Sequence, residues 1–399
     1  MYQVKKVTVP PSTERVSLFK GPRKILFGFN SLRILGKELT DLKAHRLLIV
    51  TDPQICKLGY VERIVEQLDD METQVFSRVK REPTISELED LASEVRRQGY
   101  DAIMGLGGGS VMDSAKIASL SATNPGPIAN YVGVDKVQNK GLPLICAPTT
   151  SGTGSEVTRY AVIKYERTKK AVTSDLIIPD VALVDSALTV SMPRKLTAYT
   201  GLDALAHAIE AMISSWATPL TDILALGAVR LIFQNLEKAY NNGDDIEARY
   251  YMSIAATTAG LAFNDPKVML AHSIGQTIGP IYNIPHGLSV ALPLPHMLDF
   301  YMGTSADKIS MISEAAAIHD PEKTDEENAR AMITELIHFY KRLDVSLSLK
   351  EFGIRLDELE KLAEYTVRFQ PRSNSPIQFS NENILEVYRK MWKMGDPEV

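Results

Sequence analysis

Residues 101–122 read DAIMGLGGGSVMDSAKIASLSA. The run DAIMGL is typical of a buried strand, and VMDSAKIASLSA has the pattern of a helix. Gly107, Gly108 and Gly109, followed by Ser110, separate the two. Glycines at such a junction let backbone N–H groups approach a phosphate, and the helix N-terminus adds a favourable partial charge. The stretch therefore predicts an α/β domain in which this loop is either a phosphate-binding loop or only a tight turn.

Short apolar runs alternate with amphipathic segments on both sides of this stretch, from about residue 46 to residue 184. A helix is expected at residues 83–99, with Thr84 or Ser86 as its N-cap. Strands that alternate with helices predict a parallel sheet covered on both faces. The further strand candidates are RLLIV (46–50), TQVF (73–76), PLICAP (143–148), YAVI (160–163) and VALV (181–184).

The pattern changes after Met192 and Pro193. Almost every later segment has the 3.6-residue period of a helix. We therefore expect an α/β domain at residues 1–189 and an all-helical domain at residues 190–399. The clearest helical segments are 220–240, 246–263, 327–343 and 356–367.

Composition and charge exclude several classes of protein. The 399 residues suffice for two domains with substantial cores. A formal net charge of −5 without long runs of one sign gives no indication of a nucleic-acid or anionic-membrane partner. No apolar run is long enough to span a membrane, and residues 1–17 lack the apolar core of a signal peptide. Cys56 and Cys146, the only cysteines, are too few for a disulfide framework, so we expect a cytoplasmic protein.

Three of the seven histidines form a pattern with one aspartate in the helical half. Asp203 and His207 are four residues apart in an Ala- and Leu-rich segment, so on a helix they share one face. His272 lies in a second helical pattern, and His286 follows a proline where a third helix is expected to begin. One carboxylate and three imidazoles could hold a divalent ion such as Fe²⁺, Zn²⁺, Mn²⁺, Co²⁺ or Ni²⁺. The alternative for each histidine alone is an ordinary buried side chain.

Asp52 and a hydroxyl-rich loop supply polar groups at the ends of predicted strands. Asp52 could accept hydrogen bonds from an adenosine ribose and would repel a 2′-phosphate, which favours NAD over NADP. Its alternative role is that of a turn residue before Pro53. The loop PTTSGTGSE (148–156) suits contacts with ribose, pyrophosphate or nicotinamide, and Lys170 is near enough in sequence to reach over it. The ordinary Rossmann fingerprint fits poorly, because its acidic residue follows the glycines, whereas Asp52 precedes them.

With these pieces in place, the chain resembles the iron-containing alcohol dehydrogenases, the metal-dependent group III family. The resemblance covers nearly the whole chain. It implies a Rossmann-like, dinucleotide-binding α/β domain with a parallel sheet, followed by an all-α domain, in an architecture similar to that of dehydroquinate synthase, with the active site in between. The matching motifs are GLGGGSVMDSAK (105–116), APTTSGTGSEVT (147–158), PDVALVDSALTVSMPRKLTAYTGLDALAHAIEA (179–211) and IYNIPHGLSVALP (281–293).

The resemblance also implies an activity and a set of site residues. It implies a metal-dependent alcohol dehydrogenase or aldehyde reductase, which transfers a hydride between NAD(H) and a small primary alcohol or aldehyde and forms a homodimer or larger homo-oligomer. Iron is the metal that it favours. The implied metal ligands and catalytic residues are Asp203, His207, His272 and His286; the implied cofactor contacts are Asp52, Gly107, Gly108, Gly109, Ser110, Thr149, Thr150, Thr153 and Lys170.

Two positions depart from the family pattern. Gln276 stands where the family has a second histidine, so a proton path that needs a titrating side chain there would be lost. Glu82 stands where the family has an asparagine, which changes the cofactor contact expected there. The alternatives are an enzyme similar to glycerol dehydrogenase or dehydroquinate synthase that uses zinc and NAD, and a catalytically silent metal-binding oligomer. Tyr160, Phe263 and Val268, with Met269, could line an apolar substrate pocket or serve only for packing.

Overall fold

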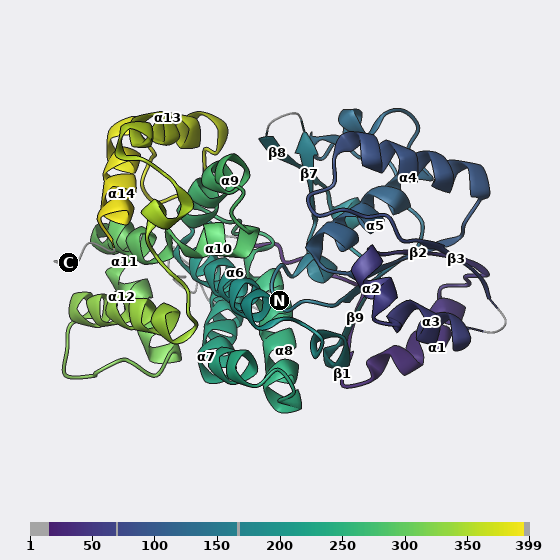
Figure 1. Cartoon of the computed structure of the whole chain (residues 1–399), viewed down its shortest axis with the longest axis horizontal. Coiled ribbons are helices and arrows are strands. Elements are labelled where there is room, and N and C mark those ends of the chain that lie inside the picture. Colours follow the sequence, from purple (N-terminus) through teal and green to yellow (C-terminus); the bar gives the residue numbers. More distant parts are fainter. Residues whose placement is uncertain (1–15, 69–70, 166–167, 395–399) are drawn as a thin grey trace, which may run out of the picture.

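The computed structural model describes residues 16–68, 71–165 and 168–394, which form two parts lying side by side (Figure 1). The first part, purple to blue, contains the sheets, and the second, green to yellow, consists of helices. Within these described ranges, no helix is long and apolar enough to cross a membrane. Most of the N-terminal segment expected to lack a signal peptide, residues 1–15, lies outside the described residues.

A parallel sheet of six strands forms the centre of the first part, in the order β1-β9-β6-β4-β2-β3. This confirms the predicted parallel sheet and the strand candidates assigned to it. The unpredicted strand is β1, which pairs with β9 at one edge. The six strands are β1 (Lys24–Gly28), β2 (Arg46–Val50), β3 (Glu72–Phe76), β4 (Ala102–Gly107), β6 (Leu144–Pro148) and β9 (Val181–Asp185).

Helices cover both faces of this sheet. Alternate residues of β2 point in opposite directions, so Leu47 packs in one apolar cluster and Leu48 in another. The first cluster includes α1 and α3, and the second includes α4 and α5. Thr84, one of the two predicted caps, begins α4 through a capping box with Glu87. The helices are α1 (Leu35–Asp41), α2 (Pro53–Lys57), α3 (Tyr60–Glu66), α4 (Ile85–Gln98) and α5 (Gly109–Ser121).

A second, small sheet contains the predicted strand YAVI. Its order is β5-β8-β7, and β7 is antiparallel to β8. The expectation that YAVI extends the parallel sheet was therefore wrong. Only two residues separate β7 from β8, and so short a connection joins antiparallel strands, because a parallel crossover needs a dozen residues or more. The strands are β5 (Gly133–Val134), β7 (Tyr160–Tyr165) and β8 (Thr168–Thr173).

The second part is helical, as predicted. Its first helix, α6, is buried along almost its whole length and packs against α7, α8 and α10. The helices are α6 (Arg194–Ile213), α7 (Pro219–Asn241), α8 (Ile246–Phe263), α9 (Leu270–Tyr282), α10 (His286–Ala291), α11 (Leu294–Ala315), α12 (Asp325–Arg342), α13 (Leu359–Phe369) and α14 (Asn381–Lys393).

The two parts meet where α8 packs against the hydroxyl-rich loop. Gly154 has a positive φ of 62°, and a Cβ added to Gly260 of α8 would lie 2.8 Å from the Gly154 Cα and 2.7 Å from a Val157 methyl group. The Thr257 hydroxyl also donates to Glu156 Oε1 at 2.7 Å. Glycine at both positions thus allows the close contact that fixes this loop against the helical part.

Candidate active site

Helix α6 carries Asp203 and His207 one turn apart, and α10 approaches it closely. A Cβ on Gly287 would lie 2.2 Å from the Tyr199 carbonyl oxygen of α6, so only glycine permits this approach. His286 is the first residue of α10, directly after Pro285, as the sequence predicted. Because Gly287 has no side chain, α10 can pack closely on α6, and His286 lies on the same face of α6 as Asp203.

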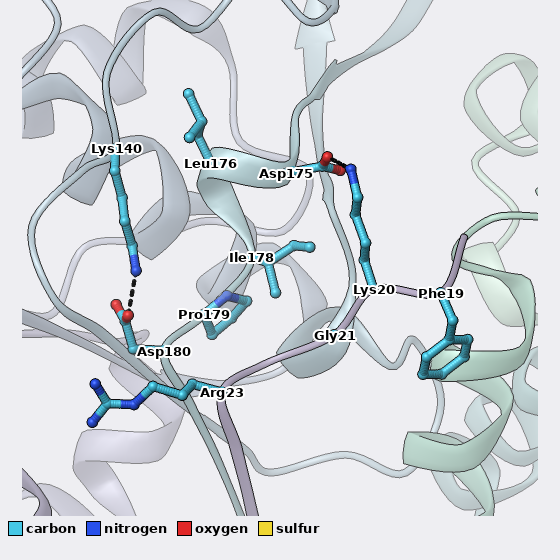
Figure 2. A pocket seen from close by; sticks show the side chains of 10 residues that line it. All are labelled: Phe19, Lys20, Gly21, Arg23, Lys140, Asp175, Leu176, Ile178, Pro179 and Asp180. Carbon is cyan, nitrogen blue, oxygen red and sulfur yellow. Dashed lines mark hydrogen bonds and ion pairs between the residues drawn. The ribbon is translucent and has the colours of Figure 1, made fainter. Parts of the chain in front are cut away.

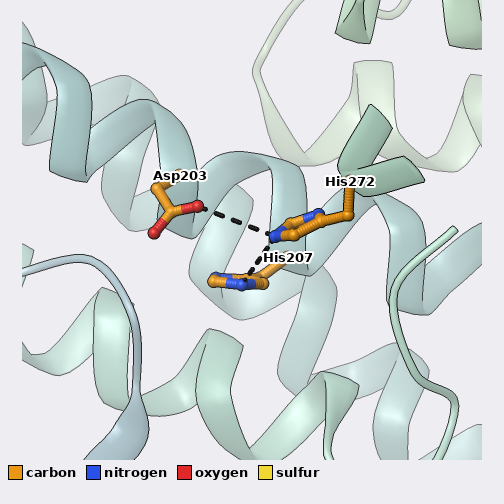
Figure 3. A group of neighbouring side chains, drawn as sticks. All are labelled: Asp203, His207 and His272. Carbon is orange, nitrogen blue, oxygen red and sulfur yellow. Dashed lines mark hydrogen bonds and ion pairs between the residues drawn. The ribbon is translucent and has the colours of Figure 1, made fainter. Parts of the chain in front are cut away.

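The buried side chains of Asp203, His207 and His272 converge on one point (Figure 3). The Nε2 atoms of the two histidines are 3.0 Å apart, and His272 Nε2 lies 3.7 Å from Asp203 Oδ1. One potential ligand atom from each residue lies within 4.8 Å of the other two. Metal–nitrogen bonds of roughly 2.0–2.1 Å at tetrahedral angles separate ligand atoms by about 3.3 Å, so this spacing fits a shared ion.

His286 lies at the rim of the group. Its Nε2 is 3.9 Å from Asp203 Oδ1, and its ring is edge-on to His272 at 5.8 Å between centroids. About a third of its side chain is exposed (32%), whereas those of Asp203 and His272 are 3% exposed. His286 thus approaches Asp203 and His272 but lies outside the close group of three, on its more exposed side.

The protonation of these groups suits a cation. Burial lowers the pKa of His207 and of His286 well below the usual value, and the neighbouring charge of His272 acts in the same direction. Burial also raises the pKa of Asp203 to about 6, opposed by the charges of His272 and Lys169. Asp203 Oδ1 is buried and accepts no hydrogen bond from any described residue. The neutral imidazoles of His207 and His286 and a carboxylate oxygen without a donor fit one divalent ion.

Glu210, which the sequence reading did not single out, fixes the orientation of His272. Its Oε2 is hydrogen-bonded to His272 Nδ1, and its Oε1 accepts from the His272 backbone N–H at 3.2 Å. A carboxylate behind one ring nitrogen directs the lone pair of the other towards a metal. The signal was available, since Glu210 lies three residues after His207 on the same face of α6.

The glycine loop occupies the predicted position between a strand and a helix. Gly107 ends β4, Gly108 is the N-cap of α5, and Gly109 and Ser110 begin that helix. A Cβ on Gly109 would lie 2.7 Å from the Thr153 methyl group, so the loop fits closely against the hydroxyl-rich segment. Backbone N–H groups in a helix's first turn point outward from its N-terminus, as anion binding requires.

The threonines of the hydroxyl-rich loop lie beside these glycines. Thr149 donates its backbone N–H to the Gly107 carbonyl at 3.0 Å. A Cβ added to Gly108 would lie 3.5 Å from the side chain of Thr150. Thr153 Oγ1 accepts from the Ser155 N–H at 3.2 Å. The structure therefore brings the two predicted cofactor-binding segments together.

Lys116 of α5 holds the hydroxyl-rich loop in place through hydrogen bonds. Its fully buried ammonium donates to Ser155 Oγ at 2.9 Å, to the Thr158 carbonyl at 2.9 Å and to the Tyr160 carbonyl. Asp113, one turn earlier, accepts from Ser155 Oγ at 2.6 Å. These two residues belong to the motif quoted above, but their supporting role depends on contacts that the sequence alone did not specify.

Asp52 lies at the carboxyl end of β2, next to the glycine loop. The Thr51 hydroxyl donates to the Leu106 carbonyl at 2.7 Å and so connects the ends of β2 and β4. Asp52 Oδ1 caps α2 by accepting the N–H groups of Gln54 and Ile55. This cap agrees with its alternative role as a turn residue, and it also holds the carboxylate at the carboxyl end of β2, near the glycine loop.

Lys170, predicted to reach over the hydroxyl-rich loop, and its neighbour Lys169 differ in their surroundings. The exposed Lys170 places its ammonium 4.5 Å from the centre of the Tyr165 ring. Lys169 is only 10% exposed and pairs with Glu82 at 2.8 Å. Its charge also lowers the pKa of Asp203 and His286, so it is Lys169 that points towards the metal site. Successive strand residues point to opposite sides, so a shift of one position decides which lysine does so.

A cavity of about 490 Å³ lies elsewhere, between residues 19–23 and the segment that precedes β9 (Figure 2). Ion pairs between Lys20 and Asp175 and between Lys140 and Asp180 partly close it. None of the predicted site residues lines this cavity.

Comparison with known proteins assigns the chain to a family. Residues 22–186 match the family described as iron-containing alcohol dehydrogenase, and residues 197–392 match the C-terminal domain of that family. Long-chain-alcohol dehydrogenase 1 of Geobacillus thermodenitrificans is 36% identical, over 90% of this chain and 93% of its own. NAD-dependent methanol dehydrogenase of Bacillus methanolicus is 33% identical, over 92% and 98%. A crystal structure of a 1,3-propanediol oxidoreductase superposes with a TM-score of 0.91 at 30% identity, over 94% of this chain and all of the other. The chain belongs to the iron-containing alcohol dehydrogenase family.

Proposed function

We propose that this protein is an NAD-dependent alcohol dehydrogenase and aldehyde reductase that binds one divalent metal ion, iron foremost, through Asp203, His207, His272 and His286. The convergence of Asp203 Oδ1 with the imidazole Nε2 atoms is the observation that carries the proposal. Family membership supports iron. The same donors would accept Zn²⁺, Mn²⁺, Co²⁺ or Ni²⁺.

Cofactor binding is proposed for the edge of the parallel sheet that faces the helices. In this proposal residues 1–189 form the NAD-binding domain and residues 190–399 the metal-binding domain. The charge of Asp52 favours NAD over NADP. The proposed contacts are Asp52, Gly107, Gly108, Gly109, Ser110, Thr149, Thr150 and Thr153, with Lys169 in place of the initially predicted Lys170.

Each side chain of the proposed site has its own role in hydride transfer. When bound, the ion supplies Lewis acidity and the nicotinamide donates or accepts the hydride. Asp203 offsets part of the ion's charge, and Glu210 holds His272 in one tautomer. Phe263 stacks on His207 at 4.2 Å between ring centroids and covers it from solvent. Gln276 cannot titrate near neutral pH, so proton exchange with solvent must use another group.

The proposal includes a homo-oligomeric assembly and a cytoplasmic location. The apolar side chains of Phe27 and Phe29 are 57% and 41% exposed on and beside the edge strand β1, which supports a homodimer or larger homo-oligomer. Both cysteines are free, which agrees with a cytoplasmic location.

The test is NADH oxidation by the purified protein, followed by absorbance with a panel of short aldehydes after loading with Fe²⁺ or Zn²⁺. We expect turnover that a chelator abolishes and added metal restores. A protein that binds the metal at these residues but turns over no alcohol or aldehyde would be the silent metal-binding oligomer instead. Turnover that is indifferent to the chelator would contradict the metal's role.

A further inference from the structure

Two cationic side chains, Lys267 and Arg372, lie near the start of α9, the helix that carries His272. Lys267 belongs to the connection 264–269, which follows Phe263 of α8 and leads into α9. Phe263 stacks on His207, and His272 is the third residue of α9. Lys267 thus lies in the segment between Phe263, which contacts His207, and α9, which carries His272. Within the described part of the chain, neither cation forms an ion pair with a carboxylate within 4.0 Å, although both are half-buried.

Asn374 holds the loop that carries Arg372 against this connection. Its side-chain amide donates to the carbonyl oxygens of Pro266 at 2.7 Å, Lys267 at 3.3 Å and Val268 at 3.4 Å. The two cations therefore belong to one fixed structure, even though about a hundred residues separate them in sequence.

Arg372 runs along the face of α9 that carries His272. It donates from Nη2 to Gln276 Oε1 at 2.9 Å and from Nε to the Met269 carbonyl at 3.4 Å. Gln276 lies one turn beyond His272, so the guanidinium is adjacent to the proposed site. Both acceptors are neutral, which leaves the positive charge without a direct partner. The charge of Glu210 acts on Arg372 from a distance, but that carboxylate is bonded to His272.

Lys267 also has no carboxylate within 4.0 Å in the described part of the chain, although the charges of Asp135 and Asp265 act on it from a distance. Its ammonium lies 4.6 Å from the centre of the Trp216 ring, and its backbone has a positive φ of 63°. Burial lowers its pKa, and the charges of Arg159 and Arg372 lower it further. Asp265 is the carboxylate of the same connection, but burial raises its pKa, and its Oδ2 accepts no hydrogen bond from the described residues. Two nearby cations without direct counter-charges create a field that favours a bound anion.

We propose that Arg372 and Lys267 bind an anionic group at the far end of the substrate, a carboxylate or sulfonate, while the aldehyde carbon faces the metal site. This inference rests on the proposed function and names its substrate class. Phe263 and Val268 lie between the metal ligands and the cations in sequence and suit a short apolar spacer. The reaction is OHC–R–COO⁻ + NADH + H⁺ → HOCH₂–R–COO⁻ + NAD⁺. The proposal adds a cationic end to the apolar pocket that the sequence offered as one role for Phe263 and Val268.

The test compares 4-oxobutanoate with 4-methylpentanal, a neutral aldehyde of nearly the same shape, using the metal-loaded enzyme. We expect kcat/KM for 4-oxobutanoate to exceed that for 4-methylpentanal at least ~10-fold. Arg372→Gln and Lys267→Met should each lower kcat/KM for 4-oxobutanoate by ~10- to 100-fold, the usual effect of losing a hydrogen bond to a charged group. Their kcat/KM for 4-methylpentanal should change by less than ~3-fold. Arg330→Gln, at an exposed arginine of α12, is the matched control.

Equal losses on both substrates would mean that Arg372 only supports the fold of the loop, and would overturn the inference. A wild-type preference for 4-methylpentanal would do the same. Calorimetric binding of 4-hydroxybutanoate and 4-methyl-1-pentanol separates this inference from the proposed function. Selective binding of the acid, lost in Arg372→Gln, supports the anion site even if no aldehyde is turned over, in which case the proposed function alone fails.

Discussion

At the residue scale, His207 and His272 hold their Nε2 atoms 3.0 Å apart in a buried space. Burial lowers the pKa of His207 well below its usual value, which favours the neutral ring that can bind a metal. A cation between the two nitrogens would bind both rings, and Asp203 would add a negative charge. This arrangement makes the affinity for metal sensitive to each side chain separately.

His207→Ala should therefore lower the affinity for metal by at least about 100-fold, because losing even a partner behind a ligand costs 10- to 100-fold. Metal content per chain, measured by plasma mass spectrometry, and turnover should fall together, while circular dichroism shows a folded protein. His338→Ala, at a half-exposed histidine of α12 far from the site, should keep its metal. Full metal occupancy in His207→Ala would contradict the assignment.

Asp52→Asn tests the preference for NAD at another single residue. Asparagine can still cap α2 but carries no charge, so the preference for NADH over NADPH should narrow by about tenfold, or ~1.4 kcal/mol. The ratio of the two kcat/KM values is the measurement. Asp101→Asn is the control, since Asp101 binds the backbone of His45 and Arg46 at the opposite end of the strands. An unchanged ratio in Asp52→Asn would remove Asp52 from the cofactor site.

The spacing of residues in the sequence identified the candidate metal ligands, but not all of the residues around them. The four-residue interval between Asp203 and His207 fixes their common face on any helix. Lys169 was missed because a one-residue shift in a strand reverses the side chain. Arg372 was missed because it is a hundred residues from Gln276, and nothing local in the sequence indicates that they touch.

At the scale of elements, the approach of α8 to the loop 154–157 joins the sheet-containing part to the helical part. Gly260 and Gly154 make that approach possible, because a Cβ on Gly260 would lie 2.7–2.8 Å from Val157 and Gly154. The loop at this contact also carries Thr153, which packs on Gly109. A small displacement of α8 would therefore change the distance between the two halves of the site.

Gly260→Ala should lower the free energy of unfolding by about 1–3 kcal/mol through overpacking, and lower kcat as well. Gly227→Ala is the matched control, because Gly227 lies in α7 with no atom within 4 Å of its added Cβ. That control should be neutral or stabilising by about 0.5–1 kcal/mol, as expected for alanine in a helix. Urea unfolding measures both. Equal free energies of unfolding for the two variants would contradict a tight contact at Gly260.

The type of most elements could be read from periodicity, since buried parallel strands and long helices have the strongest patterns. Three strands were not predicted: β1, whose half-exposed residues give no continuous apolar run, and β5 and β8 of the small sheet. The strand β7 was predicted, but its partner is set by a short connection rather than by its own composition. Close packing between elements, as at Gly287 and Gly260, depends on tertiary contacts and could not be predicted from periodicity.

At the scale of the whole molecule, a part that contains the sheets lies beside a part that consists of helices (Figure 1). The proposed site combines residues of both parts. The change of pattern near residue 190 predicted this division into sheet and helices. How copies of the chain assemble depends on the surface, where, among the described residues, β1 is the last strand at one edge of the sheet. An apolar open edge favours pairing with another chain.

Phe27→Glu should therefore weaken self-association by about 100-fold or more, because a charge would replace an exposed aromatic side chain on this edge. Light scattering after size-exclusion chromatography should show an oligomer for the wild type and a smaller species for the variant. Val75→Glu, on the opposite edge strand β3 with 39% exposure, should leave the mass unchanged. A monomeric wild type would contradict the proposed oligomer.

The central claim is that one divalent ion joins Asp203, His207, His272 and His286 between the two parts of the molecule. Anomalous diffraction from iron-loaded crystals, recorded on both sides of the iron absorption edge, tests it most directly. The account predicts one peak per chain, within about 2.0–2.3 Å of Asp203 Oδ1 and the Nε2 atoms of the three histidines. A peak at other residues, or none at this site in a crystal whose solution contains iron, would contradict the account.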